Sequence, residues 1–226
     1  MPGSGFDPDL WARERIKQGK HQRYWYLFKK LIPEKYRPEI RYLEIFDRKD
    51  SLTVTTMRPK NKKIFTLRIS FDLFDLEPSY SSEILDYAFI ICTMIHEFGH
   101  YLEMHNDQQS SLRGDSILKI NSIVRKFKTM SESNAEREGA YVTEYAKTSW
   151  DEDFADTFAY FVLLDECPEP GVSILGDKVR LFYKYPEFVE IRESIRANIR
   201  KLGIHPNMSR DELKKLDIYP STSDTN

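Results

Sequence analysis

The stretch from Thr93 to Tyr101 constrains this 226-residue chain more than any other, because it contains the pattern H-E-x-x-H. Its histidines are His96 and His100, and Glu97 directly follows the first of them. Residues four apart lie on one face of an α-helix, so both imidazoles reach one metal ion if the stretch is helical. Zinc suits imidazole ligands, and a catalytic zinc has three protein ligands and an open position for water. We therefore expect one zinc ion here, with Glu97 as the general base that takes a proton from the water.

The residues before the motif predict that it lies inside a domain. A helix over this region is apolar on nearly all sides, through Ile84, Leu85, Ala88, Ile90, Ile91, Cys92, Met94 and Ile95, and such a helix is buried. Two histidines and a glutamate at its end need partners, because unpaired buried polar groups are costly. This surrounding argues against the alternative, in which two histidines lie on a solvated helix face.

A third metal ligand must come from another part of the chain. The extended pattern H-E-x-x-H-x-x-G-x-x-H fails, since Glu103 stands at its glycine position and Asn106 at its last histidine. The stretch from Ser149 to Asp156 places Glu152 and Asp156 four apart on a second expected helix. One carboxylate would bind zinc while the other orients an imidazole through its free N–H. The alternative is a capping box, in which Glu152 bonds back to the backbone N–H of Ser149.

The other patterns predict strands in the first half of the chain and helices in the second. A helix from Asp9 to Leu31 precedes strand-like segments at 41–46, 52–57 and 65–71, which short polar turns would join into an antiparallel meander. A further helix is expected near 117–127, followed by a solvated loop at 131–139. An apolar helix then runs from 150 to 164, and one or two covering helices follow between 178 and 202, with a break near Pro186.

Composition excludes several classes of partner. Lys+Arg 34 against Asp+Glu 36 leaves almost no net charge, so we expect neither nucleic acid nor an anionic membrane as partner. No apolar run reaches transmembrane length. The first residues lack the pattern of a signal peptide, so a cytoplasmic location is the default expectation, with secretion open if a leader was removed or export is signal-independent. Two cysteines do not make a disulfide framework, and Cys92 is expected to be a buried thiol.

Together the two motifs resemble those of the glutamate zincins, zinc peptidases whose third ligand is a helical glutamate. H-E-F-G-H followed by E-D-F-A-D-T-F-A is most similar to the catalytic domain of anthrax lethal factor and related small bacterial metalloendopeptidases. The similarity covers about a third of the chain, roughly residues 80 to 165. It implies zinc ligands His96, His100 and Glu152, and an oxyanion-stabilising Tyr145 seven residues before Glu152. Asp156, where that family has glutamate, would hold a ligating imidazole with a shorter side chain.

This resemblance implies an α+β, zincin-like fold. We expect a single domain over residues 1–226, with an N-terminal lobe at about 10–105 and a helical lobe at about 106–220. The first lobe would hold a small antiparallel or mixed sheet and the metal-binding helix. In zincin folds an edge strand before that helix pairs with the substrate backbone, which assigns this role to the strand at 65–71.

The implied function is a zinc-dependent metalloendopeptidase, which hydrolyses peptide bonds of a protein substrate through a zinc-activated water. One alternative is an intracellular regulatory protease of the repressor-cleaving type, because such proteases also combine H-E-x-G-H with an E-x-x-A-N-x-F-A helix. Their insertion between the two motifs is usually much shorter than the one in this chain. The other alternative is a catalytically inactive zinc-binding interaction module, whose zinc site would be structural or vestigial.

Overall fold

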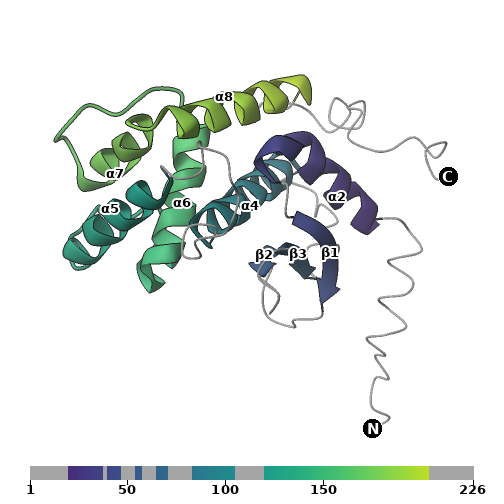
Figure 1. Ribbon diagram of the computed structural model, residues 1–226, viewed down its shortest axis with the longest axis horizontal. Helices are drawn as coiled ribbons and strands as arrows, with labels where there is room; N and C mark the ends of the chain where they lie inside the picture. The colour runs from purple at the N-terminus through teal and green to yellow at the C-terminus, as the bar shows by residue number, and fades with distance from the viewer. Residues whose placement is uncertain are drawn as a thin grey trace, which may run out of the picture. The chain divides into compact units, whose positions relative to one another are not determined.

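The computed structural model describes residues 20–37, 40–46, 54–57, 65–70, 83–104 and 120–203 (Figure 1). The chain divides into two compact units, one formed by Met1–Ala88 with Asn198–Asn226 and the other by Phe89–Ala197. Both H-E-x-x-H and the second motif, with Glu152 and Asp156, lie in the unit Phe89–Ala197. A single domain with lobes at about 10–105 and 106–220 stays a prediction.

The first unit contains helix α2, Lys20–Leu31, and a short 3-10 helix, Glu34–Tyr36. Pro33 follows α2 closely, and a proline cannot continue the hydrogen-bonding pattern of a helix. The last carbonyls of α2 and of the residue after it are satisfied by side chains: Asn198 Nδ2 donates to the oxygen of Leu31 at 3.1 Å, and Arg37 Nε to that of Ile32 at 2.8 Å. The predicted helix from Asp9 is thus present from Lys20, and its earlier part lies outside the described residues.

The same unit holds strands β1 (Ile40–Phe46), β2 (Val54–Met57) and β3 (Phe65–Ser70), in the order β1-β3-β2. β3 pairs antiparallel with β2 but parallel with β1, so the predicted antiparallel meander is wrong. Polar turns show where strands end, but they do not determine on which side of the sheet the next strand is added. β3 is central and hydrogen-bonded on both sides, so its predicted role as an edge strand for substrate is also wrong.

The expected α+β fold class is wrong as well, because the described chain is mainly helical. The three strands are short and confined to the first unit. Among residues whose side chains the structure describes, Ile40 alone belongs to a strand. Every residue of the second motif and of H-E-x-x-H lies on a helix, and the unit around them packs helix against helix.

The second unit consists of most of α4 (Glu83–Met104) with α5 (Ile120–Ser133), the 3-10 helix η2 (Tyr145–Thr148), α6 (Trp150–Leu163), α7 (Ile174–Tyr183) and most of α8 (Pro186–Lys201). The break near Pro186 is confirmed, whereas α5 continues three residues into the predicted loop 131–139. None of the helices described here is long and apolar enough to cross a membrane.

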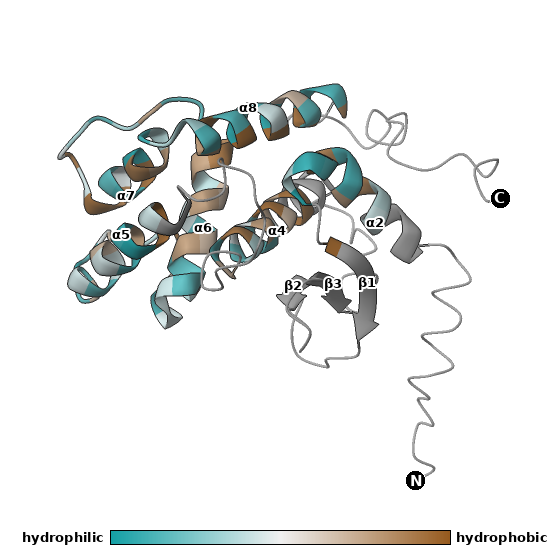
Figure 2. Cartoon of the chain, viewed as in Figure 1, coloured by the Kyte–Doolittle hydropathy of each residue, from teal (hydrophilic) through white to brown (hydrophobic). Residues whose placement is uncertain are grey.

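Fully buried phenylalanines form the core of this unit: Phe127, Phe154, Phe158, Phe161, Phe182 and Phe188. They come from α5, α6, α7 and α8, and ring centroids of neighbouring pairs lie 5.1–6.2 Å apart. α6 is the most apolar of these helices along its middle turns (Figure 2). α6 carries the second motif, and this packing on several sides holds it in place.

Both ends of α6 are held by side chains. Ser149 is the N-cap, and its hydroxyl accepts the backbone N–H of Glu152. At the other end, Arg192 Nε donates to the carbonyl of Phe161 at 2.9 Å, and Arg196 donates to the carbonyls of Val162 and Leu163, both at 3.1 Å. Positive charge at a helix C-terminus also interacts favourably with the helix dipole. These contacts position α6 along its own axis.

Candidate metal centre

Helices α4 and α6 approach each other closely at Gly99, the glycine within H-E-F-G-H. A Cβ atom on Gly99 would lie 2.9 Å from the Cα of Ala155 and 3.3 Å from its carbonyl oxygen. Only a residue without a side chain allows this approach, and Ala155 keeps the facing side small. The close approach brings the histidines of α4 within reach of the carboxylates of α6.

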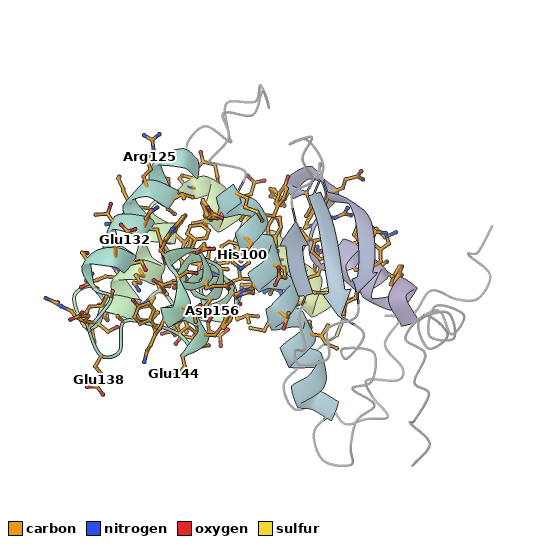
Figure 3. All side chains as sticks on the ribbon, turned by 90° about the horizontal axis from the view of Figure 1, so that it is seen from below. His100, Arg125, Glu132, Glu138, Glu144 and Asp156 are labelled. Atoms are coloured by element: carbon orange, nitrogen blue, oxygen red, sulfur yellow. The ribbon has the colours of Figure 1, made fainter. Side chains whose placement is uncertain are left out.

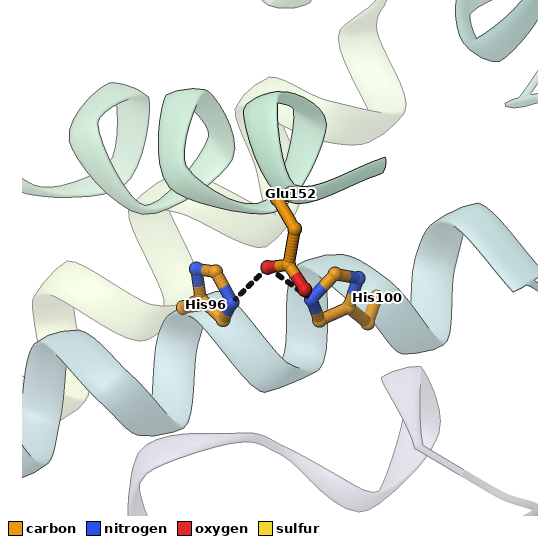
Figure 4. Close-up of side chains that lie close together, drawn as sticks. All are labelled: His96, His100 and Glu152. Atoms are coloured by element: carbon orange, nitrogen blue, oxygen red, sulfur yellow. Dashed lines mark hydrogen bonds and ion pairs between the residues drawn. The ribbon is translucent and has the colours of Figure 1, made fainter. Parts of the chain in front are cut away.

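His96, His100 and Glu152 converge at this crossing (Figure 4). One carboxylate oxygen, Glu152 Oε2, lies 3.2 Å from His96 Nε2 and 3.1 Å from His100 Nε2. All three candidate ligand atoms lie within 4.8 Å of one another. Ligand atoms at about 2.0–2.1 Å from a tetrahedral zinc lie roughly 3.3–3.4 Å apart. The donor set of two imidazoles and a carboxylate, at these spacings, fits zinc.

Asp156 holds the first imidazole from its other side. His96 Nδ1 lies 2.7 Å from Asp156 Oδ1, and a carboxylate only accepts hydrogen bonds, so Nδ1 is the donor. With a proton on Nδ1, Nε2 is the nitrogen that faces Glu152 and is available to a metal. The second carboxylate oxygen, Asp156 Oδ2, accepts a hydrogen bond from the hydroxyl of Thr143.

The charges of this cluster favour a cation between the ligands. Burial acts to lower the pKa of His96, but hydrogen bonds to Asp156 and Glu152 and the charge of Glu97 raise it to about 10. The pKa of the Glu152 carboxyl is held well below its usual range: burial acts to raise it, and the two histidines and Tyr145 outweigh that effect. Without metal the cluster therefore retains a proton on His96, which balances part of the negative charge of the carboxylates. A bound zinc would balance that charge instead.

Glu97 is buried beside this cluster, with 4% of its surface exposed. Its charge contributes to the raised pKa of both His96 and Tyr145. The carboxylate is therefore close to the ligands without belonging to the convergent set of three. Its role as the general base stays a prediction.

Tyr145 begins η2 and lies on the exposed side of the centre, with 55% of its surface exposed. Its hydroxyl donates to Glu152 Oε1 at 2.9 Å, while the other oxygen of that carboxylate faces the histidines. Burial of the hydroxyl, its bond to Glu152 and the nearby negative charges raise the pKa of Tyr145 to about 12. The phenol is therefore protonated and able to donate at neutral pH.

Among the described residues, neighbouring acids lie outside the convergent set of three. The Glu144 side chain is 89% exposed, bonds Lys147 through both oxygens at 2.7 Å and points away from His100 and Asp156 (Figure 3). Glu103 is buried one turn after the motif, and His105 and Asn106 lie outside the described residues. Of the capping box, only the half made by Ser149 is present: its side chain accepts the backbone N–H of Glu152. The two oxygens of Glu152 bond side chains of the centre instead, His100 and Tyr145. Cys92 is exposed, so its predicted burial is wrong.

Two residues at this centre were not anticipated from the sequence. Gly99 lies inside the motif, and the glycine itself was the available signal of a close helix approach. Thr143 has no such signal, because a threonine 13 residues before Asp156 follows no helical or strand spacing. Its contact arises only when the segment before η2 folds back over α6.

Comparison with known proteins agrees with this geometry. Residues 47–167, more than half of the chain, match the model of a family described as "Putative zinc-binding metallo-peptidase". The chain belongs to this family of zinc-binding metallopeptidases. The matched range includes the whole candidate centre, from His96 to Asp156. No curated protein and no solved structure matches the chain.

Proposed function

We propose that the chain is a zinc-dependent metalloendopeptidase of the glutamate-zincin type, with one zinc ion held by His96, His100 and Glu152. The observation that carries this proposal is the position of Glu152 Oε2, within 3.2 Å of the Nε2 atoms of both histidines. The hydrogen bond from His96 Nδ1 to Asp156 supports it, because it leaves Nε2 as the metal-facing nitrogen.

Each residue of the centre has a chemical role in this proposal. A bound zinc supplies a Lewis acid that polarises a carbonyl and lowers the pKa of water. Glu97 accepts the proton of the attacking water at its carboxylate and returns it to the leaving amine. The Tyr145 hydroxyl donates to the carbonyl oxygen as negative charge develops there. Asp156 keeps the imidazole of His96 in the required tautomer.

The proposed substrate is a protein or peptide, and the proposed subtype is the one similar to lethal factor. The subtype is supported by the seven-residue spacing from Tyr145 to Glu152 and by the long segment between the two motifs. The bond from Tyr145 to the Glu152 side chain adds support, because it shows that this spacing puts the phenol at the carboxylate. The nearly balanced charge favours neither nucleic acid nor an anionic membrane as partner.

Metal content and hydrolysis test the proposal together. The purified protein should contain one zinc per chain, cleave a generic peptide library, lose activity with a chelator and regain it with zinc. Glu152→Ala should lose zinc under conditions in which Glu144→Ala, the matched change at an exposed acid, retains it. Full zinc retention by Glu152→Ala would show that another residue is the third ligand.

Glu97→Gln separates an enzyme from a binding module. The amide has nearly the shape of the carboxylate but accepts no proton, so this variant should keep zinc and fold while losing nearly all turnover. Wild-type activity in Glu97→Gln would mean that the base is another group. Stoichiometric zinc without hydrolysis of any peptide by the wild-type protein would instead favour the inactive interaction module.

A further inference from the structure

The hydroxyl of Thr143 joins two parts of the candidate centre that are separate in the sequence. It donates to Asp156 Oδ2, and it accepts the backbone N–H of Ala146 at 3.1 Å. Asp156 is in the second turn of α6, whereas Ala146 is the buried residue of η2, directly after Tyr145. One side chain thus contacts both the carboxylate behind His96 and the turn that carries the phenol.

The two bonds determine where the hydroxyl proton points. A threonine hydroxyl has one proton and two lone pairs. The N–H of Ala146 occupies a lone pair, and the Asp156 carboxylate can only accept, so the proton of Thr143 is directed at Oδ2. Asp156 Oδ1 is then left to accept from His96 Nδ1 at 2.7 Å. The result is a chain of bonds from the backbone of η2 through Thr143 and Asp156 to the imidazole.

The carboxylate of Asp156 is held at both of its oxygens, which matters for a side chain as short as aspartate. An aspartate is one methylene shorter than a glutamate, and its carboxylate must keep one rotation to reach His96 from α6. A hydrogen bond to each of its oxygens, from His96 on one side and Thr143 on the other, fixes that rotation. Partners of this kind hold metal-ligating histidines and alter metal affinity when they are removed.

We infer that Thr143 is a positioning residue of the zinc centre, which holds Asp156 against His96 and simultaneously anchors the turn of Tyr145. The inference rests on the proposed function for its effect on hydrolysis, but its effect on zinc does not require that the protein be an enzyme. Thr143 itself is exposed and touches no candidate ligand atom in any bond described here, so it acts through Asp156 and the backbone of Ala146.

The experiment compares the rate of zinc release from three variants of the full chain, measured with a chromogenic chelator in the absence of substrate. Thr143→Val keeps the shape and removes the hydroxyl, and should release zinc about 3- to 10-fold faster, below the 10–100-fold typical of a direct imidazole partner. Thr143→Ser keeps the hydroxyl and should behave like the wild type. Thr148→Val is the matched control, because among the described residues this hydroxyl, which lies in η2, bonds the backbone oxygen of Tyr145 at 2.7 Å and neither Asp156 nor Ala146.

A double variant tests the path of the effect. If Thr143 acts on zinc through Asp156, then the double variant should release zinc less than about twofold faster than Asp156→Ala alone. Circular dichroism confirms that each variant is folded before release is measured. Equal release from Thr143→Val and Thr148→Val overturns the inference, as does a Thr143→Ser variant as fast as Thr143→Val.

Hydrolysis by the zinc-saturated variants supplies an independent readout. Thr143→Val should lower kcat with little change in KM, since the turn of Tyr145 is loosened without a change in the proposed ligands. If the wild type hydrolyses no peptide while Thr143→Val still releases zinc faster, the proposed function fails and the positioning inference stands. If the wild type is an active peptidase and Thr143→Val is normal in both readouts, the inference alone fails.

Discussion

At the scale of residues, the centre has three buried or half-buried carboxylates around two imidazoles: Glu97, Glu152 and Asp156. Like charges this close repel, and such an arrangement is stable only with a cation or bound protons among them. Burial acts to lower the pKa of His96, but hydrogen bonds to Asp156 and Glu152 raise it to about 10, so without metal a proton on this imidazole supplies the balancing charge. A bound zinc would replace that proton as the balancing positive charge.

Tyr145 has two possible roles at this scale, and Tyr145→Phe distinguishes them. As an oxyanion donor the hydroxyl contributes about 2.7–4 kcal/mol to transition-state binding, so kcat should fall roughly 10²–10³-fold with KM and zinc content nearly unchanged. The measurement is steady-state hydrolysis by the zinc-saturated variant. The bond from the hydroxyl to Glu152 Oε1, 2.9 Å long, provides the competing role of holding the ligand carboxylate.

The control for this change is Tyr141→Phe. The Tyr141 hydroxyl bonds the carbonyl oxygen of Ala135 at 3.3 Å, so its removal tests the loss of a phenol oxygen nearby but outside the centre. Faster zinc release from Tyr145→Phe, with kcat recovered at saturating zinc, would assign Tyr145 to holding Glu152. A fall of less than about threefold in kcat, with normal zinc release, would make it part of the scaffold.

At the scale of elements, the crossing of α4 and α6 determines whether the ligands meet. Gly99→Ala should increase the intrinsic helix propensity of α4 by about 1 kcal/mol. The new Cβ, however, would lie 2.9 Å from the Cα of Ala155, a backbone atom that cannot rotate away. Overpacking of this kind costs about 1–3 kcal/mol. We therefore expect net destabilisation together with weakened zinc binding, because separating the helices moves Glu152 away from both histidines.

Urea unfolding and zinc titration of Gly99→Ala measure these two effects. If Gly99→Ala is more stable by about 1 kcal/mol and binds zinc unchanged, then only the gain in helix propensity is seen and the new Cβ has no steric cost. That result would contradict the close approach of the two helices.

A second element-scale contact is the buried ion pair between α7 and α6. Lys178 Nζ donates to Asp153 Oδ2 at 2.6 Å and to the carbonyl of Ala140 at 2.7 Å, and neither side chain of the pair is exposed. Burial acts to lower the pKa of Lys178, and Asp153 opposes that effect. Asp153 follows Glu152 directly, so the pair also fixes the first turn of α6.

Lys178→Met should destabilise the protein by about 3–5 kcal/mol, because it leaves the Asp153 carboxylate buried without its cation. Lys184→Met, at an exposed lysine after α7, is the matched control and should change stability by less than about 0.5 kcal/mol. The double variant Lys178→Met with Asp153→Leu should recover much of the loss, since an apolar pair of similar volume is often neutral. Chemical unfolding measures all three. A loss below about 1 kcal/mol in Lys178→Met would contradict the importance of the pair.

These elements also show which parts of the molecule were predictable from the sequence. The helix at 150–163 and the break before α8 followed from local patterns, apolar spacing and Pro186, and both are confirmed. The order of the strands depends on which side of β3 each neighbour is added, and no local pattern contains that information. The burial of Lys178 was equally unpredictable, because lysine is almost never fully buried unless a distant residue pairs with it.

The candidate site divides in the same way. The shared face of His96 and His100 is a consequence of helix geometry four residues apart, which a sequence specifies completely once the helix is assumed. The approach of Glu152 depends on the contact of Gly99 with Ala155, and the support of Asp156 depends on Thr143. Both are contacts between segments that are remote in sequence, and only the fold brings them together. The roles of these residues stay predictions.

At the scale of the whole molecule, metal and proton compete for His96, so zinc should alter the pH dependence of unfolding. The raised folded-state pKa of His96, about 10, means that its contribution to stability is fully present below the unfolded value of 6.5. That contribution is lost as pH rises from 6.5 through about 10. Glu152, with its lowered pKa, contributes above the ordinary value of 4.5 and loses its contribution as pH falls below it. The chelated protein should therefore become less stable between pH 6.5 and 8.5.

Zinc should oppose this alkaline loss. Binding requires a neutral imidazole and releases the proton of His96, so zinc affinity rises over the same pH range in which the metal-free protein weakens. A ligand stabilises the folded state by RT ln(1 + [L]/Kd), so a lower Kd for zinc at higher pH should widen the Tm difference between zinc-loaded and chelated protein from pH 6.5 to 8.5. Asp156→Asn removes a carboxylate that raises the pKa of His96, so it should flatten the pH dependence of the chelated protein. Thermal unfolding at several pH values, with and without chelator, measures the effect. A Tm difference independent of pH would mean that zinc binds without displacing this proton.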